Sequence, residues 1–198
     1  DIVLTMFGME KPVKIGTLNA NGDFEINLSV NPTEKLSEEE RELYISNLSY
    51  GFQYVCGNPG DFPEGEAKIA SSAQHIALWA DNTWAGVLFP VSDLKLQLWM
   101  EDNGFNDAVE GSFYQVLLVT EDVNLQKKCT NFDYYNDEDI EVNVEYDLKL
   151  KKGLNLIAYQ LESVYKTNPD IRASFPKKIR MTNAGDNPKI MWIAKYFF

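Results

Sequence analysis

Polar and apolar side chains alternate without interruption over the twelve residues 139–150. Successive side chains of a β-strand point to opposite faces, so this run can bury one face and expose the other. A helix would spread the same residues around its whole circumference. The pattern therefore predicts a long strand in an antiparallel sheet with one solvated face. The side chains expected to be buried are Ile140, Val142, Val144, Tyr146, Leu148 and Leu150.

A second apolar-rich run, residues 154–165, follows this strand after the short segment Lys151-Lys152-Gly153. Glycine adopts the positive φ angles that tight turns require at little steric cost. The two runs are therefore predicted to form a hairpin, 139–150 paired with 154–165, that turns at Gly153.

Further runs with strand character are separated by turn-forming residues. Asn21-Gly22 lies between residues 13–18 and the alternating residues 24–30, which predicts another hairpin. Residues 93–100 alternate Leu or Met with polar side chains and predict a half-exposed strand, whereas residues 113–119 are almost wholly apolar and predict a strand covered on both faces. The other predicted strands are residues 2–4, 68–80, 84–89 and 189–197.

One helix is predicted near residues 37–47. Ser37 and Glu40 have the spacing of a capping box, and the acidic first turn complements the helix dipole. Many strands with turn residues between them, and one short helix, predict an all-β fold: an antiparallel β-sandwich. Residues 1–198 are expected to form a single β-rich domain, and the Gly- and Pro-rich stretch 50–66 is the one candidate for a boundary within it.

The net charge of the chain disfavours some classes of binding partner. The chain carries 30 acidic and 18 basic side chains, a formal net charge of −12. Nucleic acids and anionic membranes need a positive surface, so both are disfavoured as partners. The sequence contains no apolar run near the roughly 20 residues of a membrane-spanning helix. It also shows no signal-peptide pattern and opens directly into Ile2-Val3-Leu4, as a mature chain without its leader would.

The chain has two cysteines, Cys56 and Cys129. Each lies near a predicted loop, and the sequence does not show whether the two meet. A disulfide between them and two separate thiols are both compatible with the pattern.

Acidic and amide side chains gather in residues 101–107, with Gly104 among them. Calcium takes six to eight oxygen ligands, so Asp102, Asn103 and Asp107 are candidate Ca²⁺ ligands. The spacing is not that of an EF-hand, and a solvated polar turn explains the same residues. A second acidic cluster, residues 136–139, has the same two interpretations. The sequence indicates no other cofactor.

Exposed tryptophans can stack on sugar rings, which makes Trp84 and Trp99 candidate ligand-binding residues. The alternative is packing in the core or across strands, as is common for aromatic side chains in sheets. The single histidine, His75, is interpreted as a strand residue, because the chain has no nucleophile elbow that would pair with it. Paired carboxylates could hydrolyse glycosides, but with 30 acidic residues the sequence singles out no pair.

Three stretches carry a resemblance to a known group of proteins. They are residues 18–26 around Asn21-Gly22, the segment Trp99-Met100-Glu101-Asp102 with the later Glu110-Gly111-Ser112, and residues 148–157 around Lys151-Lys152-Gly153, to which the late Trp192 is added. Together they resemble secreted bacterial surface lipoproteins of unknown function, which are typical of Bacteroidetes and other Gram-negative surfaces. Leu154 stands where tryptophan is commoner in that group. The resemblance implies a secreted or lipid-anchored β protein and carries over no catalytic residues.

The sequence therefore favours an exported, surface-tethered β-sandwich protein with a binding or structural role and no catalytic activity. Its expected location is extracellular or on the outer-membrane surface, and its expected partner is a carbohydrate or another surface protein. The alternative is a carbohydrate-active hydrolase that uses paired carboxylates.

Overall fold

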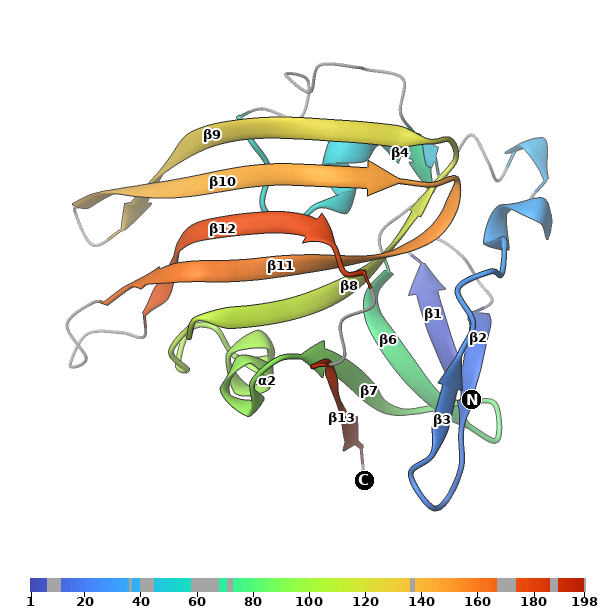
Figure 1. Ribbon diagram of the computed structural model, residues 1–198. Helices are drawn as coiled ribbons and strands as arrows, with labels where there is room; N and C mark the ends of the chain where they lie inside the picture. The colour runs from blue at the N-terminus through green and yellow to red at the C-terminus, as the bar shows by residue number, and fades with distance from the viewer. Residues whose placement is uncertain are drawn as a thin grey trace.

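Thirteen strands of the described chain join in one hydrogen-bonded sheet (Figure 1). The structure is a computed structural model that describes residues 1–6, 12–35, 37–39, 45–57, 68–70, 73–135, 138–166, 174–185 and 189–197. The strand order is β3-β2-β1-β6-β7-β8-β11-β12-β10-β9, and β13 pairs with β7, β5 with β8, and β4 with β5. The bounds are β1 (Ile2–Met6), β2 (Val13–Leu18), β3 (Phe24–Ile26), β4 (Ile45–Asn47), β5 (Lys68–Ala70), β6 (Ala73–Ala80), β7 (Thr83–Val91), β8 (Gly111–Val119), β9 (Val123–Tyr135), β10 (Glu138–Leu150), β11 (Gly153–Tyr165), β12 (Phe175–Asn183) and β13 (Met191–Tyr196).

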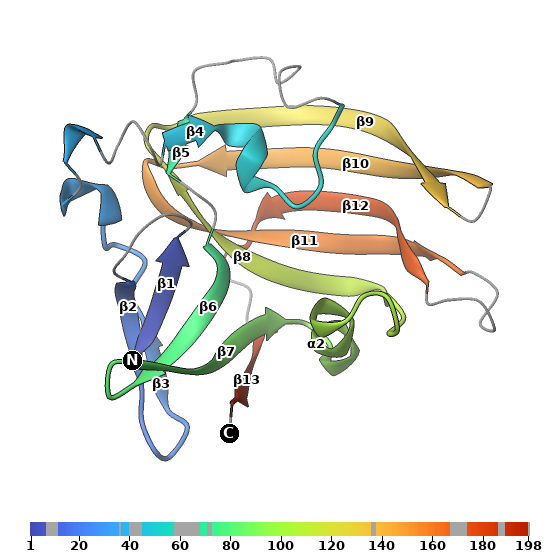
Figure 2. The ribbon, with the colours of Figure 1, turned by 180° about the vertical axis from the view of Figure 1, so that it is seen from behind.

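The predicted fold class is confirmed, because the protein is mostly β and carries the short helix α2 (Leu94–Glu101). Pairing among the described strands is antiparallel except between β10 and β12, which run parallel with Val144 beside Ile179. The sheet is therefore mixed. It bends at β8, which shares with β7 only the register pair of Val91 and Phe113, so its two parts belong to one continuous sheet (Figures 1 and 2).

Strand β10 has the alternation that the sequence predicted. Its apolar side chains from Ile140 to Leu150 are buried, and the side chains between them are exposed or half-buried. On the solvated face, charged side chains pair across neighbouring strands. Lys128 Nζ lies 3.1 Å from Glu145 Oε1, and Arg180 donates to Asp147 Oδ2 at 3.0 Å. This face therefore has the chemistry of a solvated surface.

The hairpin predicted for residues 139–150 and 154–165 is wrong in its pairing. The chain does turn before Gly153, whose φ is +110°. However, β12 lies between β10 and β11 and bonds to both (Figure 1). Strand β11 completes its other side with β8. The local turn is thus as predicted, but the strand that fills the space between β10 and β11 comes from later in the chain.

Two apolar clusters form the core, and β8 contributes to both. Phe113, Leu117 and Val119 belong to the larger cluster, on the face covered by the 3₁₀ turn η2 (Leu48–Gly51), the residues after it and α2 (Figure 2). Val116 and Leu118 face the smaller cluster, formed largely with β1, β2 and β6. All seven residues 113–119 are buried, which confirms the strand predicted to be covered on both faces.

The strand predicted for residues 93–100 is wrong, because this segment forms α2. Asp93 caps the helix by accepting from the Lys95 N–H at 2.8 Å. Leu96 and Trp99, three residues apart, face the core, whereas Leu94 and Leu98, four apart, are exposed. The buried residues are therefore spaced as on one face of a helix, although the alternation of Leu with polar residues along the sequence resembles a strand.

The helix predicted near residues 37–47 is only partly described. Glu38 and Glu39 are helical, and residues 40–44 lie outside the described chain. The predicted C-terminal end is wrong, because Ile45–Asn47 is strand β4.

The Asn21-Gly22 hairpin is confirmed as β2 and β3, but its loop spans residues 19–23 and β3 ends at Ile26 rather than at residue 30. The Asn19 side chain organises that loop by accepting from the N–H groups of Asn21 and Asp23. Within the described residues, none of the helices is long and apolar enough to cross a membrane.

Candidate binding surface and its supporting core

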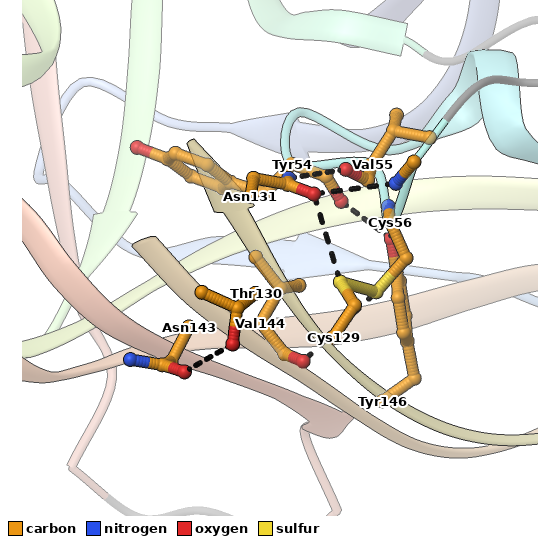
Figure 3. Close-up of a disulfide and its surroundings, with 10 residues drawn as sticks. Tyr54, Val55, Cys56, Cys129, Thr130, Asn131, Asn143, Val144 and Tyr146 are labelled. Atoms are coloured by element: carbon orange, nitrogen blue, oxygen red, sulfur yellow. Dashed lines mark hydrogen bonds between the residues drawn. A yellow bond between two sulfur atoms is a disulfide. The ribbon is translucent and has the colours of Figure 1, made fainter. Parts of the chain in front are cut away.

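The two cysteines form a disulfide, which decides between the two alternatives that the sequence left open. Cys56 and Cys129 are 73 residues apart in the chain, and their Cα atoms are 5.6 Å apart. The bond ties the segment after η2, residues 52–57, to β9 across the face of the large sheet (Figure 3). This segment is therefore held against the core by a covalent cross-link.

Hydrogen bonds from the sheet hold the same segment. The Tyr146 hydroxyl donates to the Tyr54 carbonyl at 2.6 Å and accepts from the Cys56 N–H at 3.1 Å. The Asn131 side chain donates to the Val55 carbonyl at 2.6 Å and accepts from the Gly57 N–H at 3.2 Å (Figure 3). Backbone groups buried against a sheet need such partners, because an unpaired buried group costs free energy.

A second buried contact links the segment to β8 and β11. The Tyr159 hydroxyl donates to Gln115 Oε1 at 2.7 Å and accepts from the Gln53 N–H at 3.3 Å. Burial raises the pKa values of Tyr54, Tyr146 and Tyr159 above the usual value for tyrosine. These side chains therefore stay protonated at neutral pH, and the hydroxyls of Tyr146 and Tyr159 serve as structural hydrogen-bonding groups.

A cavity beside this contact is lined by residues that include Gln53, Tyr114 and Gln115. Its volume is about 20 Å³. A space of this size holds on the order of one water molecule. The cavity is therefore not a site for a sugar or a small-molecule substrate.

The candidate calcium ligands lie in the turn that ends α2. The turn is closed by hydrogen bonds from the Asn106 side chain to the Leu98 and Asp102 carbonyls. Asp107 Oδ1 accepts from the Ser174 N–H at 2.6 Å, so this carboxylate fastens the turn to the residue before β12.

Among the residues that the structure describes, no group of three or more His, Cys, Asp or Glu side chains is placed to hold a metal. The calcium site at Asp102, Asn103 and Asp107 stays a prediction.

Three other candidates from the sequence, Trp99, His75 and the acidic cluster 136–139, do not form a described binding site. Trp99 is 5% exposed and packs against Phe113 with ring centroids 6.0 Å apart, so it offers no face to a ligand. His75 lies in β6, and its side chain is outside the description. Of the second acidic cluster, residues 136 and 137 lie outside the described chain.

Trp84 is 53% exposed, beside the β6–β7 turn. Asp81 and Asn82 form this turn with positive φ angles. The indole N–H donates to the Gly86 carbonyl at 2.8 Å, and the Phe197 ring packs edge-on against the indole with centroids 4.9 Å apart. Two contacts therefore fix the orientation of an aromatic ring that remains open to solvent.

Phe197 extends this surface through its contact with Trp84, and Tyr196 precedes it in the chain. Both rings are about half exposed, and Tyr196 pairs with Gly86 at the end of β13. We call Trp84, Tyr196 and Phe197 the aromatic corner. The sequence singles out Trp84 but not the other two, because only the pairing of β13 with β7 brings the end of the described chain beside the β6–β7 hairpin.

Comparison with protein-family models, curated proteins and solved structures finds no match to this chain. The fold and the site define an all-β protein with a disulfide-anchored segment and an exposed aromatic corner. Any statement of function therefore depends on this geometry.

Proposed function

We propose that this protein binds its ligand without catalysis and that the aromatic corner makes the contact. The observation that carries the proposal is Trp84, an exposed indole whose plane is fixed by a hydrogen bond to Gly86 and by the ring of Phe197. A ring that is already ordered loses little conformational entropy when a ligand covers it. Exposed aromatic side chains also supply a large part of the binding energy in many interfaces.

The ligand class that fits best is carbohydrate. A flat indole offers an apolar face to the C–H groups of a pyranose ring, and the sugar hydroxyls stay in water or bond to polar groups nearby. Asp81 and Asn82, in the adjacent turn, are exposed and supply such groups. An open corner also suits a long polymer better than a closed pocket does.

We extend the proposal to location, in an extracellular or outer-membrane setting. It is supported by the Cys56–Cys129 disulfide, because disulfides form and persist in oxidising compartments and are rare in the cytosol.

The alternative, glycoside hydrolysis, has no observation in its favour. A general acid needs a carboxyl group with a raised pKa. The shifted carboxyl groups among the described residues, Asp107 and Asp122, both have lowered pKa values because they accept hydrogen bonds.

The test is calorimetric titration with soluble oligosaccharides derived from cellulose, xylan, chitin and mannan. We expect at least one to bind the parent protein, and we expect Trp84→Ala to weaken that binding by at least about tenfold. The matched control is Phe132→Ala, which removes an exposed aromatic ring on β9 and leaves the corner unchanged. Binding that survives Trp84→Ala, or no binding of any of the four classes, would contradict the proposal.

A further inference from the structure

The outer face of α2 exposes a ridge of apolar side chains. Leu94 is 57% exposed and Leu98 is 47% exposed, and they lie one turn apart on the helix. Phe105, in the turn that follows, is 88% exposed. Single exposed apolar side chains are ordinary, but two on one face of a short helix and a third in the turn that follows it are typical of an interaction surface.

This surface is rigidly held. The inner face of α2 is fixed by buried Leu96 and Trp99, and its C-terminal end by the contact of Glu101 with Lys195 Nζ at 2.6 Å. The Asn106 and Asp107 hydrogen bonds described above fasten the following turn. A surface ordered before binding loses little entropy in a complex.

The stretch of chain that carries the ridge is rich in acidic residues. Residues 93–110 contain five acidic side chains and one basic side chain, Lys95. Glu101 is paired with Lys195, and the other four acidic residues of this stretch, Asp93, Asp102, Asp107 and Glu110, are exposed; we call them the acidic border. A partner that covers Leu94 and Leu98 therefore meets negative charge at its edges.

We propose that the outer face of α2 docks an amphipathic helix of a partner protein, one whose apolar stripe is bordered by lysine or arginine. Leucines four residues apart form a ridge that packs into the grooves of a second helix. The acidic border complements the basic edges of such a helix. It repels an anionic lipid surface, and it would repel the identical border of a second copy of this chain. The proposal does not depend on the aromatic corner or on carbohydrate binding.

The probe is a fluorescein-labelled peptide of about 18 residues, made of leucine and lysine with the leucines at helical spacing. A second peptide has glutamate in place of every lysine. Binding to the full chain is measured by fluorescence anisotropy, at roughly 0.05 M and roughly 0.5 M NaCl. The key variant, Leu94→Gln with Leu98→Gln, keeps the net charge and uses a good helix former. The control variant is Phe132→Gln, on β9.

We expect the lysine peptide to bind the parent and the Phe132→Gln protein equally. The double leucine variant should bind about tenfold more weakly, although its net charge is unchanged. Adding Asp102→Asn and Glu110→Gln to the parent should weaken binding and reduce its dependence on salt. The glutamate peptide should not bind.

Several results would overturn the proposal. They are no binding of the lysine peptide, equal binding by the double leucine variant, and equal binding of the glutamate peptide. Sedimentation that shows a dimer abolished by the leucine changes would assign the surface to self-association. Co-sedimentation of the parent, but not the leucine variant, with phosphatidylglycerol vesicles would assign it to a membrane.

Discussion

At Tyr146, one buried hydroxyl serves two backbone groups of the anchored segment. It donates to the Tyr54 carbonyl and accepts from the Cys56 N–H. Tyr146→Phe keeps the ring, which packs on Phe52, but leaves both groups without this partner. We expect the free energy of unfolding to fall by about 1–3 kcal/mol. Urea denaturation measures it.

The matched control for this change is Tyr50→Phe, which removes a hydroxyl from an exposed ring in η2. Its free energy of unfolding should differ from that of the parent by less than about 0.5 kcal/mol. Equal midpoints for the two variants would mean that the Tyr146 hydroxyl does not hold the segment.

Asp107 is expected to make the free energy of unfolding fall as the pH becomes acidic. Hydrogen bonds from Ser174, the one from its N–H being the stronger cause, lower the pKa of this carboxyl below its ordinary value. The folded state therefore gains stability from the carboxylate above about pH 4, and loses it as pH falls through the lowered pKa. Asp107→Asn should be less stable than the parent at neutral pH and should lose less stability on acidification.

Melting temperatures of the parent and of Asp107→Asn, measured between about pH 2 and pH 7, test this prediction. Two pH profiles with the same shape would show that Asp107 is not the group responsible.

On the scale of one element, β13 depends on a glycine in its neighbour. A Cβ at Gly86 would collide with the carbonyl oxygen of Lys195, on the strand that pairs with it. Gly86→Ala should therefore displace β13, with a cost of about 1–3 kcal/mol, and disturb Tyr196 and Phe197. Hydrogen exchange of the amides of residues 191–197 should accelerate.

Gly104→Ala is the control for the strand variant, because its Cβ would meet only Asp102 Oδ1 at 3.6 Å, an ordinary contact distance. Protected β13 amides in the Gly86→Ala protein would contradict the prediction.

Elements differ in how far the sequence predicts them. Strand β10 was predictable because each inward position is apolar. Strand β9 was missed because its inward positions include Cys129 and Asn131, which bond to the anchored segment and break the pattern of apolar side chains that predicts a strand. Strand β12 was missed because Pro176 and the two lysines after it interrupt the alternation, and only Ile179 and Met181 show the buried apolar positions of a strand.

The sequence also predicts only part of the aromatic corner. Trp84 stands next to turn residues, so local sequence indicates its exposure. Trp99 has a similar local pattern but is buried, because its segment is a helix rather than a strand. Phe197 joins the corner through long-range pairing, which no local pattern contains.

For the molecule as a whole, the Cys56–Cys129 bond closes a long loop. The two cysteines are 73 residues apart, so the bond restricts the unfolded chain strongly. The chain-entropy model gives about 4 kcal/mol for a loop of this order. Cys56→Ala with Cys129→Ala should lower the free energy of unfolding by about that amount. Denaturation with and without a phosphine reductant measures it.

In the same experiment the reductant should bring the parent down to the stability of the double variant and leave the variant unchanged. A parent that is indifferent to the reductant would contradict the assigned bond.

The position of β12 also constrains the order of events during synthesis. Strands β10 and β11 leave the ribosome one after the other, yet the space between them belongs to a strand that begins only at Phe175. Until then, two neighbouring strands have inward edges without their final partner, and such edges can pair with other chains. A chain that stops before β12 therefore exposes two strand edges that can aggregate, and the pairing of β12 with both neighbours removes that hazard.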